Sequence, residues 1–105
     1  YGLVSGGRTN TANGEFSSVS GGLANQAVGN YGSVSGGRAN TANGENALVS
    51  GGKSNIANGE YSTISGGVEN VAENKFSSIC GGMKNEENIV DENYSTACCK
   101  SNKSH

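Results

Sequence analysis

The sequence predicts an all-β fold, a parallel β-roll solenoid, from three features that recur every fifteen residues. They are a Ser-Gly-Gly triplet, a Val or Ile directly before it, and an Asn three residues after it. The triplets are Ser5-Gly6-Gly7, Ser20-Gly21-Gly22, Ser35-Gly36-Gly37, Ser50-Gly51-Gly52, Ser65-Gly66-Gly67 and, with Cys in place of Ser, Cys80-Gly81-Gly82. The asparagines are Asn10, Asn25, Asn40, Asn55, Asn70 and Asn85. A fixed period this short is typical of one structural unit stacked on itself, here in coils of fifteen residues.

Each repeat is predicted to hold two short strands and two turns. Residues 16–20, rich in aromatic and β-branched types, predict the first strand, and residues 24–27 predict a smaller second strand. The Gly-Gly pair between them permits positive φ at a sharp corner. Asn-Gly pairs predict the second corner. These pairs are Asn13-Gly14, Asn43-Gly44 and Asn58-Gly59.

Two arrangements of this unit remain open. Because Asn-Gly is also a strong hairpin signal, the chain could be an antiparallel meander. A parallel solenoid places each position above its equivalent in the next coil, about 4.8 Å away, which explains why the same residue recurs there. The identity of the repeated residues favours the solenoid.

The regular pattern covers residues 1–85, as six repeats, and residues 86–105 form an irregular C-terminal cap and tail. An aromatic residue follows Phe76 only at Tyr94, eighteen residues later rather than fifteen. Terminal repeats of solenoids are commonly atypical because they close the stack. The first residue is Tyr1, within the pattern and without Met, so we expect the chain to be a piece of a longer or processed protein.

Composition narrows the class of function. The 105 residues include 18 glycines and no proline, 32% are hydrophobic, and the formal net charge is −2. Seven basic residues scattered among nine acidic ones do not make a nucleic-acid surface, and no apolar run is long enough to insert into a membrane. One large aliphatic residue per repeat gives a thin core, so we expect self-association to supply further buried surface.

The run from Phe16 to Ala27 resembles the head repeats of trimeric autotransporter adhesins, the YadA-like head. Similar repeats occur in some phage tail fibres and other extracellular fibre proteins. The resemblance extends over residues 1–85. It implies a left-handed roll with one repeat per coil, three chains side by side as a homotrimer, and a role in cell adhesion.

No constellation of catalytic residues is evident. The only histidine is His105, at the end of the chain, and no phosphate-binding glycine motif occurs. Asp91 is the only aspartate, so the regular aspartates of a calcium-binding roll are missing. We expect no enzyme activity, no cofactor and no metal.

The repeated asparagines and threonines allow structural and binding interpretations. We expect the asparagines to form a hydrogen-bonded ladder along the axis, although a polar ladder could also bind glycans. Thr9, Thr11 and Thr41 suggest an ice-binding face, but the position of Thr11 and Thr41 holds other residue types in the remaining repeats.

Aromatic residues recur at the first position of the repeat and predict a stripe along one edge. They are Tyr1, Phe16, Tyr31, Tyr61 and Phe76, with Asn46 in the fourth repeat. We expect this stripe to be an interface between chains, because it would otherwise be an exposed apolar patch. The most variable positions predict side chains that are presented to a partner, among them Arg8, Arg38 and Lys53.

The three cysteines predict a staple at the C-terminal end. Cys80 and Cys98 hold the same position of successive coils, about 4.8 Å apart, a spacing that a disulfide tolerates. Cys99 would then remain as an interchain thiol, and three free thiols are the alternative.

Asn93 and Asn102 stand in glycosylation motifs. A disulfide and glycans would both place the chain outside the cell.

Taken together, these features predict a non-enzymatic extracellular or cell-surface module, a stiff rod that presents side chains for attachment to a host surface, matrix or glycan. The alternative is a subunit of a self-assembling extracellular fibre, in which the chain's partner is itself as a trimer or a filament. A carbohydrate-binding or ice-binding surface is a weaker alternative.

Overall fold

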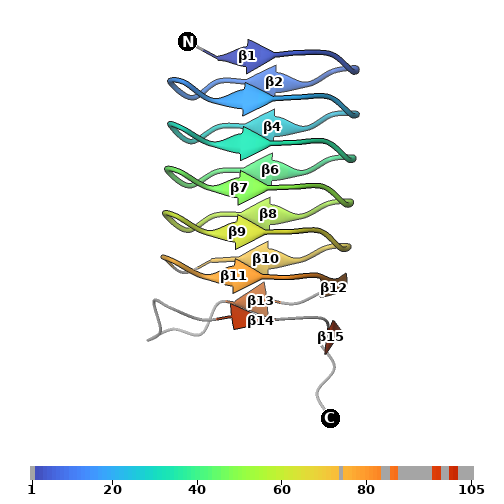
Figure 1. Ribbon diagram of the computed structural model, residues 1–105, viewed down its shortest axis with the longest axis vertical. Helices are drawn as coiled ribbons and strands as arrows, with labels where there is room; N and C mark the ends of the chain where they lie inside the picture. The colour runs from blue at the N-terminus through green and yellow to red at the C-terminus, as the bar shows by residue number, and fades with distance from the viewer. Residues whose placement is uncertain (1, 74, 84–85, 88–95, 98–99, 102–105) are drawn as a thin grey trace.

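The computed structural model describes residues 2–73, 75–83, 86–87, 96–97 and 100–101. The chain winds into a parallel β-solenoid whose coils stack along one axis, and the described residues include no helix (Figure 1). The molecule measures 40 × 21 × 13 Å, an elongated and flattened rod. The all-β solenoid prediction is confirmed.

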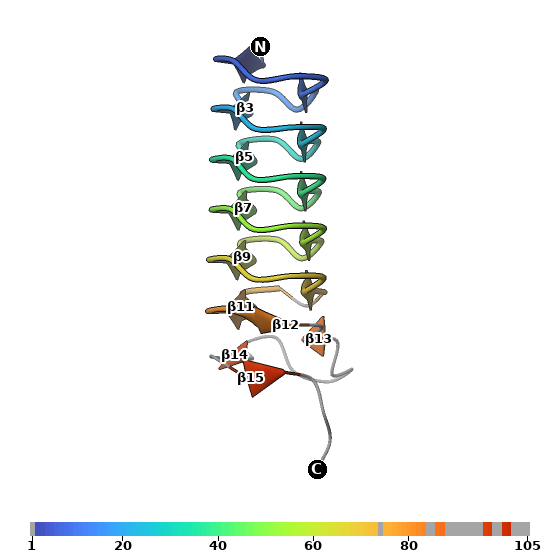
Figure 2. The same ribbon diagram turned by 90° about the vertical axis from the view of Figure 1, so that its right-hand side faces the viewer.

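Two sheets run the length of the rod on opposite sides of its interior (Figure 2). The first sheet consists of β1 (Leu3–Val4), β3 (Ser18–Val19), β5 (Ser33–Val34), β7 (Leu48–Val49), β9 (Thr63–Ile64), β11 (Ser78–Ile79) and β14 (Thr96–Ala97). The second consists of β2 (Thr11–Ala12), β4 (Gln26–Ala27), β6 (Thr41–Ala42), β8 (Ile56–Ala57), β10 (Val71–Ala72) and β13 (Glu86–Glu87). A short third sheet pairs β12 (Gly82–Met83) with β15 (Lys100–Ser101).

All strand pairs are parallel and join equivalent positions of successive repeats. Val4 pairs with Val19, and Val19 pairs with Val34. The antiparallel meander is therefore wrong for the described strands, although the Asn-Gly pairs favoured it locally. Because a parallel register places like residues above one another, the identity of the repeated positions is a consequence of the stacking.

The core is a double row of small aliphatic side chains between the two sheets. Each of the first five coils contributes one Val or Ile from the first sheet and one Ala from the second, and from the second to the fifth coil these side chains are fully buried. The buried pairs are Val19 and Ala27, Val34 and Ala42, Val49 and Ala57, and Ile64 and Ala72. The interior is thin because each coil is only two strands across.

The strands are shorter than the sequence predicts because the backbone turns at residues that look suited to strands. Phe16 and Ala24, both expected within strands, have φ angles of 59° and 57° and lie at corners. The same left-handed corners recur in every described repeat, at Thr9, Tyr31, Ala39, Asn46, Ser54, Tyr61, Glu69 and Phe76.

The two glycines of each Ser-Gly-Gly triplet have different roles. Gly37 has a φ angle of 92°, and a Cβ atom there would lie 2.3 Å from the carbonyl oxygen of Gly52. A Cβ atom on Gly36 would meet nothing within 4 Å. The second glycine therefore makes the predicted corner, whereas the first is not required by the packing of this chain.

The glycine of the Asn-Gly pairs is required by close stacking rather than by its φ angle. Gly44 does not have a positive φ, yet a Cβ atom there would lie 2.1 Å from the carbonyl oxygen of Gly59. The turn itself lies over the following residues, where Asn46 is left-handed. The second corner is therefore displaced from the predicted Asn-Gly position.

The C-terminal coil pairs in a changed register. Ile79 pairs with Ala97, and Gly82 pairs with Lys100, both eighteen residues apart. This agrees with the eighteen-residue spacing in the sequence. Cys98, Cys99, Asn93, Asn102 and His105 lie outside the described residues, as do Tyr1 and Asn85, so the predictions for them stay predictions.

Candidate functional site

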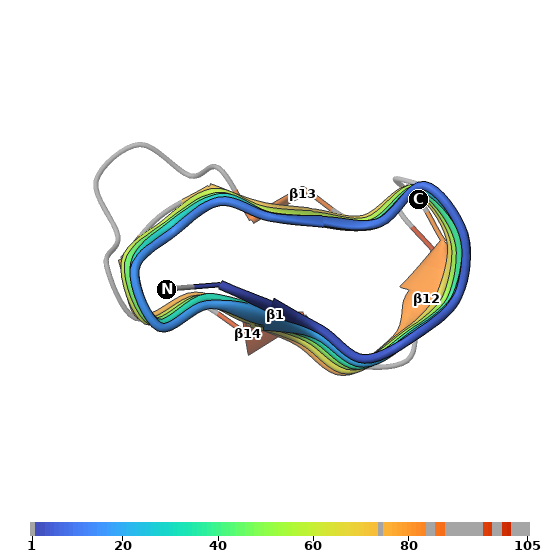
Figure 3. The same cartoon turned by 90° about the horizontal axis from the view of Figure 1, so that it is seen from above.

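The surface differs most between the two narrow edges of the flattened coil. Figure 3 shows the cross-section along the axis, with β12 at one edge and the turns that lead back to the first sheet at the other. The basic edge, continuous with β12, is the row Arg8, Leu23, Arg38, Lys53, Val68 and Met83. The aromatic edge is the row of pairs Glu15-Phe16, Asn30-Tyr31, Glu45-Asn46, Glu60-Tyr61 and Lys75-Phe76.

The basic edge has a regular backbone and variable side chains. Successive members pair as parallel bridges, for example Arg38 with Lys53, and the backbone nitrogen of Arg38 donates to the carbonyl oxygen of Gly52 at 2.9 Å. The backbone is thus held in a ladder while the side chains project outward. Arg8, Arg38 and Lys53 are all exposed, as the sequence predicts.

The aromatic edge carries two stacked ring pairs. The ring centroids of Phe16 and Tyr31 are 5.5 Å apart, and those of Tyr61 and Phe76 are 5.2 Å apart. Asn46 separates the two pairs. All four rings remain about half exposed, between 41% and 59%. The expected stripe is therefore present in the described residues, and its role as an interface between chains stays a prediction.

Tyr31 has a left-handed backbone conformation, which is unusual for a bulky residue, and two contacts stabilise it. The backbone nitrogen of Tyr31 donates to the carbonyl oxygen of Glu15 at 2.8 Å, and its ring stacks on Phe16. Stacking of this kind contributes about 0.5–1.5 kcal/mol, close to the cost of about 1–2 kcal/mol for a left-handed residue. The stack therefore offsets the backbone conformation that presents the ring.

Glutamates lie beside the aromatic residues. Glu15 and Glu45 are exposed, and Glu60 forms an ion pair with Lys75 at 3.7 Å. Both side chains of that pair are more than two-fifths exposed, so water screens it and it contributes little to stability. The two edges of the coil therefore carry opposite charge.

The asparagine ladder lies inside the coil. Asn40 is fully buried, and its side-chain nitrogen donates to the carbonyl oxygens of Gly36 and Gly52, each at 3.0 Å. Its side-chain oxygen accepts from the backbone nitrogen of Asn55 at 2.9 Å. The structural interpretation is confirmed for the described asparagines, and the buried ones, from Asn25 to Asn70, cannot present a polar face to a glycan.

A second amide row on the surface was not foreseen from the sequence. The side-chain nitrogen of Asn43 donates to the side-chain oxygen of Asn58 at 2.7 Å, and Asn58 in turn donates to Glu73 at 3.2 Å. Asn43 and Asn58 were interpreted only as turn residues. Their spacing of fifteen, the same as in the internal ladder, was the available signal.

The threonines do not form one array. Thr9 lies at a left-handed corner, whereas Thr11 and Thr41 lie on the second sheet with Gln26 between them. Instead, the serines of the triplets form an exposed row beside the first sheet. This row comprises Ser5, Ser20, Ser35, Ser50 and Ser65.

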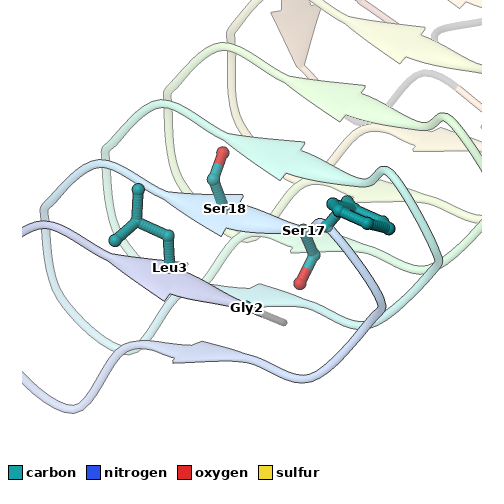
Figure 4. Close-up of a pocket in the computed structure, with 5 residues that line it drawn as sticks. Gly2, Leu3, Ser17 and Ser18 are labelled. Carbon is teal, nitrogen blue, oxygen red and sulfur yellow. The ribbon is translucent and has the colours of Figure 1, made fainter.

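An open hollow lies at the first coil, lined by Gly2, Leu3, Phe16, Ser17 and Ser18 (Figure 4). Val4 in the first coil is 41% exposed, whereas its equivalent Val19 in the next coil is fully buried. Within the described ranges, no group of three metal-ligating side chains occurs. In the same part of the chain, the structure contains no helix with the length and apolar character needed to cross a membrane.

Comparison with known proteins leaves the geometry as the main guide to function. No protein-family model matches the chain, and no curated protein matches it.

Proposed function

We propose that the chain is a non-enzymatic extracellular module, a stiff rod of left-handed fifteen-residue coils that acts as a homotrimer in adhesion. The observation that carries the proposal is the contrast between interior and edge. Inside, a Val or Ile, an Ala and an Asn recur in each of the first five coils, whereas the basic edge alternates among Arg, Leu, Lys, Val and Met. A scaffold of constant core and variable surface suits presentation of side chains to a partner.

The rod is well suited to carry load because each coil is bonded to the next along its whole path. For example, the backbone nitrogens of Ser20, Leu23 and Gln26 in the second coil all donate to carbonyl oxygens of the third coil at 2.8–3.0 Å. The asparagine ladder adds a bonded row inside. Bending would stretch several of these bonds at once.

The exposed rings support self-association. An edge with a row of half-exposed aromatic residues is unusual for a monomer with so thin a core. Burial of these rings between chains would supply the apolar surface that one chain lacks. A homotrimer, as in the adhesin heads that the repeats resemble, is our preferred assembly.

A fibre subunit is the second candidate, favoured by the parallel stacking of the coils. Each described coil bonds to the next through the same backbone ladder, and the strands of both long sheets follow one another in chain order. Further coils from a second chain would continue such sheets by strand addition. Filaments would then grow end to end.

We also infer a disulfide between Cys80 and Cys98. Support comes from the described backbone on both sides, since Ile79 pairs with Ala97 and Gly82 pairs with Lys100. Cys80 and Cys98 directly follow the residues of the first pair, and the residues of the second pair come two positions later in the sequence. Peptide mapping under non-reducing conditions tests this, and a Cys98–Cys99 or an interchain Cys80 linkage as the main product would contradict it.

Adhesion is tested with the full chain on immobilised extracellular-matrix proteins and on a glycan array, with light scattering in parallel. We expect saturable binding that falls when Arg8, Arg38 and Lys53 are replaced by Gln. Absence of binding to every surface would exclude an adhesive role for the chain alone. A discrete trimer at all concentrations would exclude the fibre, and a monomer at all concentrations would exclude both assemblies.

A further inference from the structure

The charged residues of the two edges follow the same order along the rod. The first, third and fourth coils each have a cation on the basic edge, at Arg8, Arg38 and Lys53. The same three coils each have a glutamate on the aromatic edge, at Glu15, Glu45 and Glu60. The second and fifth coils have neither. Nothing in the fold of one chain requires this match, because the two edges face away from each other (Figure 3).

We propose that the basic edge docks against the aromatic edge of a second copy of this chain, parallel and with equal coils side by side. In that arrangement Arg8 lies opposite Glu15, Arg38 opposite Glu45, and Lys53 opposite Glu60. The contact is heterologous, since each chain offers a different edge to each neighbour; it closes into a ring only where successive chains are rotated relative to one another, and otherwise continues as an open row. The proposal rests on the self-association inferred above and adds its surfaces and register.

The two coils without a cation complete the match. In the second coil Leu23 faces Asn30 and the ring of Tyr31. In the fifth coil Val68 faces Lys75, whose aliphatic stem can lie along it, and the ring of Phe76. Aliphatic residues therefore meet aromatic rings where no charge pair exists, and no cation of one edge faces a cation of the other.

Other registers lose the complementarity. A shift by one coil that pairs Arg38 with Glu60 places Lys53 opposite Lys75 and leaves a single opposite-charge pair. A shift by one coil in the other direction pairs only Lys53 with Glu45. Antiparallel packing of the two edges gives at most two such pairs, for instance Arg8 with Glu60 together with Lys53 and Glu15. Only the parallel, unshifted arrangement pairs all three.

The charges select the register, and the apolar contacts provide most of the affinity. Exposed ion pairs contribute little individually, but like charges opposite one another are strongly unfavourable. Glu60 keeps its intrachain contact with Lys75 and still offers its carboxylate outward, since that contact is 3.7 Å long and exposed.

The test compares self-association of four full-length chains by sedimentation equilibrium at low salt. They are the natural chain, the basic-edge reversal (Arg8→Glu, Arg38→Glu, Lys53→Glu), the acidic-edge reversal (Glu15→Lys, Glu45→Lys, Glu60→Lys), and the chain with both reversals. Each single-edge reversal should weaken association on the order of a hundredfold, because like charges then face each other. The chain with both reversals should associate as the natural chain does.

Mixing sharpens the test. The two single-edge reversals, each dissociated alone, should associate with each other, because one is acidic on both edges and the other is basic on both. Their complexes should hold alternating copies, so a closed trimer cannot form from them. Association of the natural chain should also weaken as salt rises toward 1 M, where the Debye length is about 3 Å.

A control that exchanges Arg8 and Leu23 isolates the register, since composition and net charge do not change. It should associate more weakly than the natural chain, with the same far-ultraviolet circular dichroism. Unaltered association of this control or of both single-edge reversals would overturn the proposed contact while leaving self-association intact. A natural chain that stays monomeric throughout would overturn both.

Discussion

At the scale of single residues, the chain is constrained most where the coils approach closely. Gly37 and Gly36 are neighbours of the same type, yet only Gly37 has the left-handed φ of 92° and a crowded Cβ position. The repeated glycine pair thus contains one residue that the fold requires and one that it tolerates losing.

Gly37→Ala should destabilise the fold by about 2–5 kcal/mol, the sum of left-handed strain and overpacking against Gly52. Gly36→Ala is the matched control, and it should change the free energy of unfolding by less than about 1 kcal/mol. Urea denaturation followed by circular dichroism measures both. Similar losses for the two variants would show that crowding at the second glycine does not govern stability.

The buried asparagines form the second residue-scale constraint. Asn40→Asp replaces two donated hydrogen bonds with a carboxylate that faces the carbonyl oxygens of Gly36 and Gly52. An unsatisfied buried charge of this kind should cost about 3 kcal/mol or more.

Asn43→Asp is its control, because Asn43 is exposed and donates only to Asn58 among the bonds of this row. Its effect on the thermal midpoint should be small, within about 0.5 kcal/mol in free energy. If both substitutions lowered the midpoint equally, the internal ladder would carry no more stability than the surface row.

At the scale of strands and turns, the sequence was informative where identical residues stack. The Val and Asn positions could be predicted because each lies above its equivalent, and the parallel register follows from that identity. The corners could not be predicted in the same way. Thr9, Ala24 and Glu69 share a left-handed conformation but no residue type, and none is a usual left-handed residue.

The corners could not be predicted because backbone hydrogen bonds between successive coils, rather than the local sequence, impose them. The backbone nitrogen of Ala24 donates to the carbonyl oxygen of Arg8, and that of Ala39 donates to Leu23, both at 2.9 Å. A bond from the preceding coil therefore fixes a conformation that the residue alone would disfavour. The opposed charges of the two edges were also visible in the sequence, but their positions on opposite sides of the coil required the fold.

The central strands should depend on their single aliphatic residue. Val34→Ala in β5 removes a fully buried side chain, and the lost burial plus the remaining cavity should cost about 2–3 kcal/mol. Val4→Ala in β1 makes the same change where 41% of the residue is exposed, and should cost less than about 1 kcal/mol. Thermal unfolding measures the loss of stability in both variants. An equal loss would contradict a core that is fully formed only from the second coil onward.

At the scale of the whole molecule, stability is expected to be a sum over coils and the contacts between neighbours. Each described strand pairs only with its neighbours in the stack, for example β5 with β3 and β7. The coils between the first and the C-terminal one are equivalent in this arrangement, so the rod should accept the loss of one whole repeat more readily than a shift of the repeat by one residue.

Deletion of residues 31–45 removes one complete repeat and joins Asn30 to Asn46, which keeps every ladder in register. The shortened chain should fold, with the length of the rod reduced by about 4.8 Å in small-angle X-ray scattering.

Deletion of residues 31–44 is the matched control, which removes one residue fewer and displaces all later positions by one. Because side chains alternate between faces along a strand, the later Val and Asn residues would then face the wrong side at the junction. That chain should lose the contact between the two halves of the stack and unfold at lower temperature. Equal unfolding temperatures for the two deletions would show that the ladders do not set the register of the coils.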